Sequence, residues 1–361
     1  MRWPAGIAVE SARTWLPETG ESAAEALHRG ALTADELVAV GYRQVPVSQE
    51  LAPPDMAVRA GRRALSAAGR EPAEVDLLVH AWTYFQGQEF FSAPHYVADR
   101  LGCTAATPLG VQQMCNGGAA ALVSAANQLT VHRDSVALVT TADRFCSPGF
   151  DRWSGDYGLW YGDGATAAVL SDDLDRPGSL VLTGAATAAA IELHAAHLVP
   201  GGFTDAPGAQ SLPVDIRAAK RSYLQRVGKQ RFAEIVAAHV RSVIREAAAE
   251  AGVALSDERL RVVAAPRLGA SGLGFYAPVI SSLTAAAIYD GGAGTGHLGA
   301  GDTLANLAAL ADDQRLRVGD SALVLSAGAG FTWTCLVVRR DQPPRAERRR
   351  LVSVSNERNS R

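Results

Sequence analysis

Cysteine is scarce in this chain, and that scarcity excludes several kinds of site. Only 4 cysteines occur among 361 residues, namely Cys103, Cys115, Cys146 and Cys335. They lie far apart and form no paired Cys-x-x-Cys motif, so the sequence predicts neither a structural zinc site nor a disulfide scaffold. We expect reduced thiols, and the simplest interpretation of Cys103, Cys146 and Cys335 is a small buried hydrophobic side chain.

An excess of charge of one sign and long apolar runs are also missing. The 34 basic and 37 acidic side chains give a formal net charge of −3, which argues against nucleic acid as a main partner because phosphate binding needs a basic face. No run of about 18 apolar residues appears, and the first residues do not have the pattern of a signal peptide. We therefore expect a cytoplasmic protein that does not enter a membrane. No histidines and carboxylates form a convincing metal set, so no metal is predicted.

What is present is an alternation of apolar, strand-like runs with alanine-rich helical stretches. Such alternation is typical of an α/β protein with a buried sheet. At 361 residues, the chain is long enough for two domains or one large layered domain. We expect strands at 76–80, 135–141, 165–170, 261–265 and 321–326. We expect helices at 55–68, 119–131, 231–251 and 303–311.

Two glycine-bounded segments suggest an internal duplication. Gly162-Asp163-Gly164 follows a helix and a strand in the first half, and Gly328-Ala329-Gly330 follows a helix and a strand in the second. A polar stretch at 174–184 marks the boundary, which gives two halves at 1–180 and 181–340. Residues 341–361 carry 6 arginines against 3 acids, and we predict a flexible basic tail there.

Cys115 differs from the other cysteines because of its setting. It lies on a turn that enters a helix of very small residues, which is followed by a strand-like run. A thiol there lies near unpaired backbone N–H groups and the positive end of the helix dipole, which favours the thiolate. We therefore predict that Cys115 is a nucleophile. Alanine and glycine on nearly every side of the helix predict that it lies between two sheets.

Four segments occur in a fixed order: Gly41-Tyr42-Arg43, the Cys115 turn, residues 161–165 and residues 328–333. In this order they resemble the thiolase superfamily and, within it, the β-ketoacyl synthase III branch. The resemblance implies the thiolase fold, a duplicated five-layer α-β-α-β-α sandwich, and an obligate homodimer. It also implies an acyl group carried on the cysteine and delivered as a thioester of coenzyme A or of an acyl carrier protein's phosphopantetheine. No permanently bound cofactor is implied.

The resemblance also assigns roles to positions. Cys115 is the acyl-accepting nucleophile, and its N–H forms an oxyanion hole with the N–H of Ala329. Condensing members stabilise an enolate with a histidine from a His-Gln-Ala-Asn segment and an asparagine from a Gly-Asn segment. Here residues 265–269 contain no histidine, and His297 replaces the asparagine. One enolate donor is lost and a titratable base is gained, which suits acyl transfer to a heteroatom better than C–C bond formation.

This pattern resembles a subgroup of ketosynthase-III-like acyltransferases from polyketide and glycoside tailoring pathways. We predict a ping-pong reaction in which Cys115 takes the acyl group and His297 then removes the proton of an acceptor hydroxyl. Asp302 is predicted to orient the imidazole across a turn, or else to serve only as a charge partner of the following helix dipole. Two alternatives stay open, a decarboxylating C–C condensing synthase and a non-catalytic partner with the same fold.

Two further groups of side chains are candidates for binding. Aromatic residues at 82–91 follow a predicted strand, where the family places pocket and dimer residues, so they predict either a substrate pocket or a dimer contact. The pocket candidates are Trp82, Tyr84, Phe85 and Phe90. Basic residues cluster at 217–231, where related enzymes dock an acidic carrier protein, although an ordinary charged helix face explains them equally well. The docking candidates are Arg217, Lys220, Arg221 and Arg226.

Overall fold

The computed structural model describes residues 1–176, 180–199 and 201–341. Residues 342–361, almost all of the predicted basic tail, lie outside the described residues. One mixed sheet runs through the described chain in the order β10-β9-β11-β12-β8-β1-β7-β6-β4-β5. Its first-half strands are β1 (Arg2–Trp15), β4 (Leu77–Ala81), β5 (Thr107–Val111), β6 (Val136–Asp143) and β7 (Gly164–Ser171). Its second-half strands are β8 (Leu180–Ala189), β9 (Leu260–Ala264), β10 (Ala287–Tyr289), β11 (Ser321–Gly328) and β12 (Thr332–Arg339).

The two halves of this sheet repeat one arrangement. In the first half β4 pairs in parallel with β5 and β6, and β7 pairs antiparallel with β6 and β1. In the second half β9 pairs in parallel with β10 and β11, and β12 pairs antiparallel with β11 and β8. The halves join where β1 runs antiparallel to β8. The fold is therefore duplicated, while the boundary near residue 180 stays a prediction.

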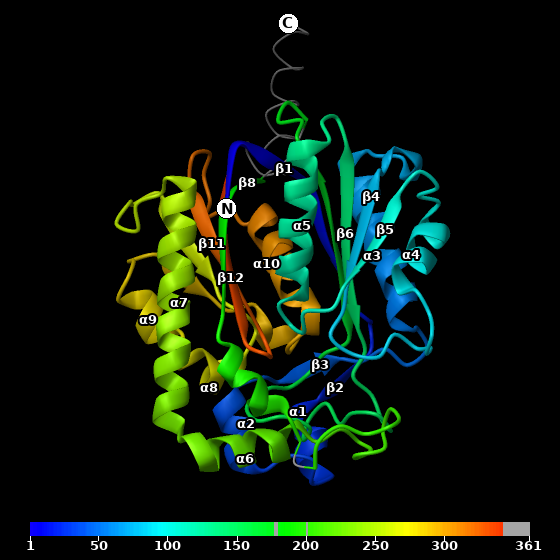
Figure 1. The fold of residues 1–361 in the computed structure, drawn as a ribbon, viewed down its shortest axis with the longest axis vertical. Helices are drawn as coiled ribbons and strands as arrows, with labels where there is room; N and C mark the ends of the chain where they lie inside the picture. The colour runs from blue at the N-terminus through cyan, green and yellow to red at the C-terminus, as the bar shows by residue number, and fades with distance from the viewer. Residues whose placement is uncertain (177–179, 200, 342–361) are drawn as a thin grey trace, which may run out of the picture.

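Helices separate and cover the two halves of the sheet. Figure 1 shows α5 (Gly117–Val131) and α10 (Asp302–Asp312) in the centre, with β11 and β12 on one side and β6 and β4 on the other. The outer layers contain α3 (Pro53–Ala68) and α4 (Ala93–Leu101) on the first half, and α7 (Lys229–Ala251) and α9 (Ala277–Ser281) on the second. This arrangement confirms the five-layer α-β-α-β-α sandwich.

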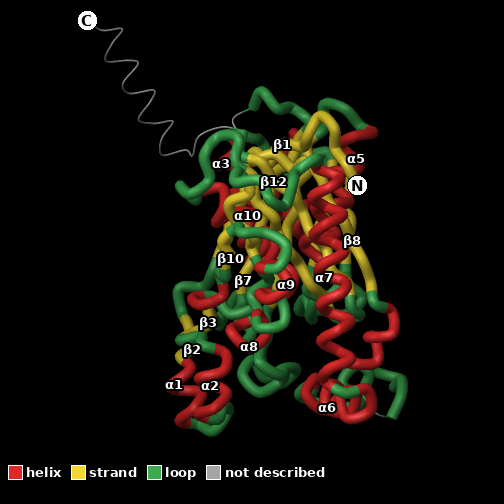
Figure 2. The backbone as a smooth tube through the Cα atoms, turned by 90° about the vertical axis from the view of Figure 1, so that its left-hand side faces the viewer, coloured by secondary structure: helices red, strands yellow, loops and turns green. Residues whose placement is uncertain are grey.

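One end of the molecule carries a further group of elements, as Figures 1 and 2 both show. They are the hairpin β2 (Gly20–Ser22) and β3 (Gln44–Pro46), and the helices α1 (Ala23–His28), α2 (Ala34–Val40), α6 (Ile216–Val227) and α8 (Gly269–Leu273). The α1 and α2 helices begin at capping boxes, in which Ser22 pairs with Glu25 and Thr33 pairs with Glu36.

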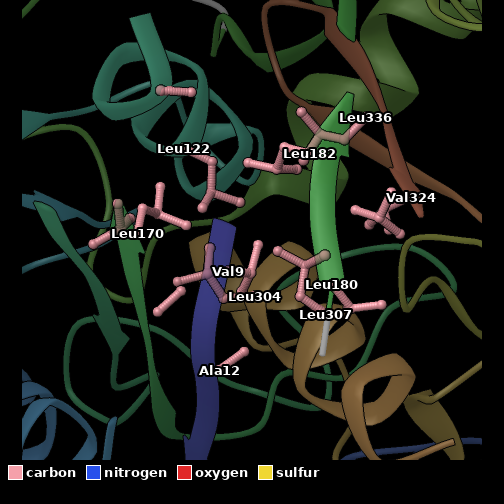
Figure 3. Packing of buried hydrophobic residues seen from close by; sticks show 14 of the residues in the cluster. Val9, Ala12, Leu122, Leu170, Leu180, Leu182, Leu304, Leu307, Val324 and Leu336 are labelled. Carbon is pink, nitrogen blue, oxygen red and sulfur yellow. The ribbon is translucent and has the colours of Figure 1, made fainter. Parts of the chain in front are cut away.

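The two central helices are packed tightly because they have apolar layers on both sides. Leu122 of α5 lies with Leu304 and Leu307 of α10 among side chains from β1 and β8 (Figure 3). Alanine and glycine elsewhere on α5 let the two halves of the sheet approach closely. The helix lies between these halves, which belong to one ten-stranded sheet and not to the two separate sheets that the sequence predicted. The closest approach is at Gly118, where an added Cβ would overlap the carbonyl oxygen of Ala300.

Replacing Gly118 with alanine is therefore expected to destabilise the fold by about 2 kcal/mol, the typical cost of overpacking a core. Urea denaturation monitored by circular dichroism measures this change. The matched control is Gly117→Ala on the same helix, because its added Cβ would find its nearest neighbours at 3.4 Å, an ordinary contact. Equal destabilisation by both substitutions would contradict the assignment of the effect to Ala300.

Candidate active site

Cys115 lies on a strained turn that the second half of the chain holds in place. Met114 has a φ of 48°, in the left-handed region that few non-glycine residues adopt. The buried side chain of Asn116 donates to Oε1 of Gln113 at 2.6 Å and to Oγ1 of Thr334 on β12 at 3.0 Å. The nucleophile turn is thus fixed to both halves before α5 begins.

An imidazole and a carboxylate stand in line with the thiol. His297 Nε2 lies 2.9 Å from Sγ of Cys115, and His297 Nδ1 lies 2.7 Å from Oδ2 of Asp302. Asp302 is the first residue of α10, and its carboxylate also accepts from the backbone amides of Leu298 and Arg267, both at 2.9 Å. The ring of His297 is only 1% exposed. This Cys–His–Asp order is that of an activated nucleophile with an oriented base.

The surroundings of His297 favour its protonated form. Burial opposes a positive ring, but the Asp302 carboxylate and the Cys115 sulfur together raise the pKa of His297 well above its usual value. Each ring N–H then has an acceptor, one at the carboxylate and one at the sulfur. A thiolate next to an imidazolium is the reactive form of cysteine nucleophiles.

The backbone of His297 is clamped by the glycine-rich segment that precedes β7. Its N–H donates to the carbonyl of Trp160 at 2.8 Å, and its carbonyl accepts from Gly162 N–H at 3.0 Å. Between these two bonds, the ring of Tyr161 meets the imidazole edge-on, with ring centres 5.2 Å apart. Asp163 is structural, since both of its carboxylate oxygens accept hydrogen bonds from the Arg152 guanidinium.

A second buried carboxylate lies behind the turn that joins His297 to Asp302. Asp143, at the end of β6, accepts hydrogen bonds from the amides of Thr83, Tyr84 and Ala300. Burial raises the pKa of Asp143 to about 7, although these bonds and the charge of His297 oppose the rise. Sequence reasoning missed Asp143, because its partners come from segments far apart in the chain.

Comparisons with known proteins match the sequence and the fold of this chain to one family. The family described as 3-oxoacyl-[acyl-carrier-protein (ACP)] synthase III matches residues 109–190, and its C-terminal counterpart matches residues 283–340. A β-ketoacyl-[acyl-carrier-protein] synthase III of Bordetella petrii is 29% identical over 335 residues, covering 90% of this chain and 95% of that protein. One of Synechococcus sp. is 35% identical over 171 residues, which cover 46% of this chain and about half, 48%, of that protein.

A solved structure agrees with the sequence matches. The protein titled ChlB3, an acyltransferase, superposes with a TM-score of 0.82 at 27% identity, covering 94% of this chain and 99% of that one. The chain is a ketosynthase III-like member of the thiolase superfamily. The two matched ranges of this ketosynthase III-like protein contain the site, Cys115 in the first and His297 with Asp302 in the second.

The predicted oxyanion donors of this ketosynthase III-like protein lie on neighbouring segments. At the end of β11, an added Cβ on Gly328 would lie 2.5 Å from the amide nitrogen of Asn116 and 2.9 Å from the carbonyl oxygen of Gln113. Ala329 follows directly, so its amide belongs to the strand end that touches the nucleophile turn. The joint role of the Cys115 and Ala329 amides stays a prediction.

The structure separates the four aromatic pocket candidates. Tyr84 packs against Phe145, with ring centres 6.2 Å apart, and Phe145 in turn meets Tyr161 at the site. Trp82 stacks on the core residue His80. Phe85 and Phe90 are 51% and 112% exposed, so in the single chain they do not line a pocket. For these two, the alternative of a contact with a second copy stays a prediction.

The docking prediction needs correction at two positions. Arg217 donates to Oε1 of Glu36 at 2.6 Å, and Lys220 donates to Oδ1 of Asp156 at 2.5 Å. Both side chains therefore turn into the protein and are already paired. Arg221 and Arg226 are exposed on the same helix, α6, and they remain docking candidates.

The described residues contain neither a membrane-spanning helix nor a metal-binding cluster. Over residues 1–176, 180–199 and 201–341, no helix is long and apolar enough to cross a membrane. The same ranges contain no group of three or more His, Cys, Asp or Glu side chains that could hold a metal ion.

Proposed function

We propose that this protein is an acyltransferase that carries an acyl group on Cys115 from a thioester donor to a hydroxyl acceptor, without decarboxylation. The donor is an acyl-CoA or an acyl carrier protein thioester, and the acceptor is a sugar or polyketide-type hydroxyl of secondary metabolism. The observation that carries the proposal is the Cys115–His297–Asp302 series, in which a half-buried thiol meets a buried imidazole and carboxylate and which supplies a nucleophile and one oriented base. The similarity to ChlB3, whose title calls it an acyltransferase, supports the same conclusion.

In the first step, the Cys115 thiolate attacks the carbonyl carbon of the donor thioester. A new S–C bond forms, and the oxyanion rests on the amides of Cys115 and Ala329. The donor C–S bond then breaks, and the leaving thiolate takes its proton from the His297 imidazolium. The products are an acyl-enzyme, a free CoA or carrier thiol and a neutral imidazole.

In the second step, His297 acts as the base for the acceptor. Once Cys115 is acylated it carries no negative charge, so one of the interactions that raise the pKa of His297 is gone. The neutral Nε2 takes the proton of the acceptor hydroxyl while its oxygen attacks the acyl carbon. The S–C bond breaks, the ester leaves, and the thiolate–imidazolium pair is restored. Asp302 holds Nδ1–H and so fixes the tautomer.

The position that holds a histidine in condensing enzymes is occupied differently here. The guanidinium of Arg267 donates to the carbonyl of Gly291 at 3.0 Å and to Oγ1 of Thr295 at 2.6 Å. Only its backbone amide reaches the site, where it holds Asp302. Of the described histidines, His297 alone hydrogen-bonds the thiol, and the Arg267 guanidinium does not supply the second donor that an enolate needs. The alternative, a decarboxylating synthase, is favoured by the names of the relatives in Bordetella petrii and Synechococcus sp..

Partners follow from the same proposal. The exposed Arg221 and Arg226 would attract an acidic carrier protein. A homodimer would cover the exposed Phe85 and Phe90 and the free edge of β5, where Leu109 is also exposed. A cytoplasmic location stays a prediction from the sequence.

Intact-mass spectrometry with a panel of acyl and malonyl thioesters tests the function. We expect a mass gain of one acyl group, its transfer to hydroxyl acceptors as an ester, and no CO₂ from malonyl donors. Release of CO₂ with a β-ketoacyl product would establish the condensing alternative. No mass gain with any donor would support the non-catalytic reading.

A further inference from the structure

A buried ion pair lies one side chain away from His297 and plays no part in the acyl-transfer steps. Asp156 is 2% exposed, and its Oδ1 accepts from Nζ of Lys220 at 2.5 Å. Its Oδ2 accepts from the hydroxyl of Tyr161 at 2.7 Å. Lys220 comes from α6, whereas Asp156 and Tyr161 come from the loop before β7.

Tyr161 joins this ion pair to the catalytic base. Its ring meets the imidazole of His297 edge-on at 5.2 Å, and its two neighbours clamp the His297 backbone through the bonds to Trp160 and Gly162. The carbonyl of Tyr161 itself accepts from the Arg152 guanidinium at 3.0 Å. Tyr161 is therefore held at its backbone and at its hydroxyl, and the ring between these two points contacts the imidazole.

The charge on Asp156 is maintained in spite of its burial. Burial works against a carboxylate, but Lys220 and the Tyr161 hydroxyl hold the pKa of Asp156 below its usual value. A carboxylate can only accept, so Tyr161 must donate and its ring has one favoured orientation. Desolvating both partners of such an ion pair costs several kcal/mol per ion, and fold stability alone gives little reason for it.

We propose that Lys220, Asp156 and Tyr161 are positioning residues that hold the imidazole of His297 in line with Cys115. The inference deepens the proposed function and rests on His297 acting as the base there. The network makes α6 part of the support of the active site. The charged and titratable groups that face His297 are Cys115, Asp302, Tyr161 and Asp143, and those that face Asp156 are Lys220, Tyr161, His197 and the Arg217 guanidinium at its carbonyl.

The test is Tyr161→Phe, which keeps the ring and removes only the hydroxyl. Alkylation of Cys115 by iodoacetamide, followed by peptide mass spectrometry over a range of pH, reports on the thiolate–imidazolium pair. We expect the pH of half-maximal alkylation to move upward, because a loosened His297 stabilises the thiolate less well. We also expect transfer to the acceptor to slow by about tenfold, equivalent to one lost hydrogen bond.

The matched control is Tyr96→Phe. Tyr96 of α4 also donates to a carboxylate, Oδ1 of Asp55, at 2.7 Å, but this bond lies on an outer layer of the sandwich. The control is expected to leave the alkylation profile unchanged. An unchanged profile and transfer rate in Tyr161→Phe would overturn the proposal, as would an equal shift in both variants.

Variants at the ion pair give a second, independent measurement. Lys220→Met leaves Asp156 buried without its cation, so we expect the pH of half-maximal alkylation to move upward, as in Tyr161→Phe. We expect Lys220→Arg, which keeps the positive charge, to bring this pH part of the way back to that of the unmodified protein. If Lys220→Met does not fold, Asp156→Asn with Lys220→Met removes both charges and is expected to show the same shift. A wild-type profile in the folded double variant would overturn the proposal. Iodoacetamide needs neither donor nor acceptor, so this outcome is distinct from a failure of the acyltransferase function.

Discussion

Replacing Cys115 with alanine is expected to abolish acyl transfer, with a fall of about 10⁴-fold or more, as when a nucleophile that acts with its base is removed. The covalent carrier is lost, and His297 loses the sulfur that it faces at 2.9 Å. No mass gain is expected with any acyl thioester. The measurement combines intact-mass spectrometry with the rate of ester formation.

The control for this experiment is Cys146→Ala. Cys146 is also a free, partly accessible thiol, so it tests whether the acyl group attaches to any available sulfur. We expect Cys146→Ala to acylate and turn over like the unmodified protein. Normal turnover by Cys115→Ala would remove the covalent mechanism altogether.

Replacing His297 with alanine is expected to separate the two half-reactions. The acyl adduct on Cys115 should still form, whereas its transfer to a hydroxyl acceptor should fall by about 10³-fold, within the range for general acid–base catalysis. Among the described residues, His297 is the base within hydrogen-bonding distance of the sulfur. Rapid mixing followed by intact-mass spectrometry measures adduct formation and decay separately.

Two further variants, one at the partner of His297 and one at a control histidine, test whether the effect is specific to the catalytic imidazole. Asp302→Asn keeps the size of the side chain but loses the charge that fixes the Nδ1–H tautomer, so we expect slower transfer by this variant also. His132→Ala, at an exposed position after α5, should behave like the unmodified protein. Unchanged transfer by His297→Ala would show that another group removes the acceptor proton.

The fold was predictable where a segment has a strong local signature. All strands and helices expected from the sequence are present, because runs such as β6 and β11 are mostly apolar, lie fully buried and are followed by turns. The sequence did not predict the other strands, among them the long strands β1 and β8. The β8 strand is rich in alanine and β1 is interrupted by a bulge, so neither shows the apolar, β-branched pattern on which recognition depends.

The site could be predicted from the sequence where a single reactive residue lies within a recognisable short motif. Cys115 and His297 were singled out in this way, and the turn between His297 and Asp302 brings the carboxylate to the ring as expected. Asp143 and Asp156 were missed because Thr83, which donates to Asp143, and Lys220, which donates to Asp156, each lie about sixty residues away in the chain. Lys220 was misread as a surface charge because counting basic residues does not reveal which face of a helix is buried.

The two central helices begin at the same place in the molecule, next to the reacting thiol. Cys115 precedes the first residue of α5, and Asp302 is the first residue of α10, so equivalent helix beginnings from the repeated halves converge on one reaction centre. Either repeat on its own would hold a nucleophile without its base, or a base without its nucleophile. Catalysis therefore requires both repeats together. If the chain were cut at their junction, the two pieces would have to reassemble before substrate could be converted.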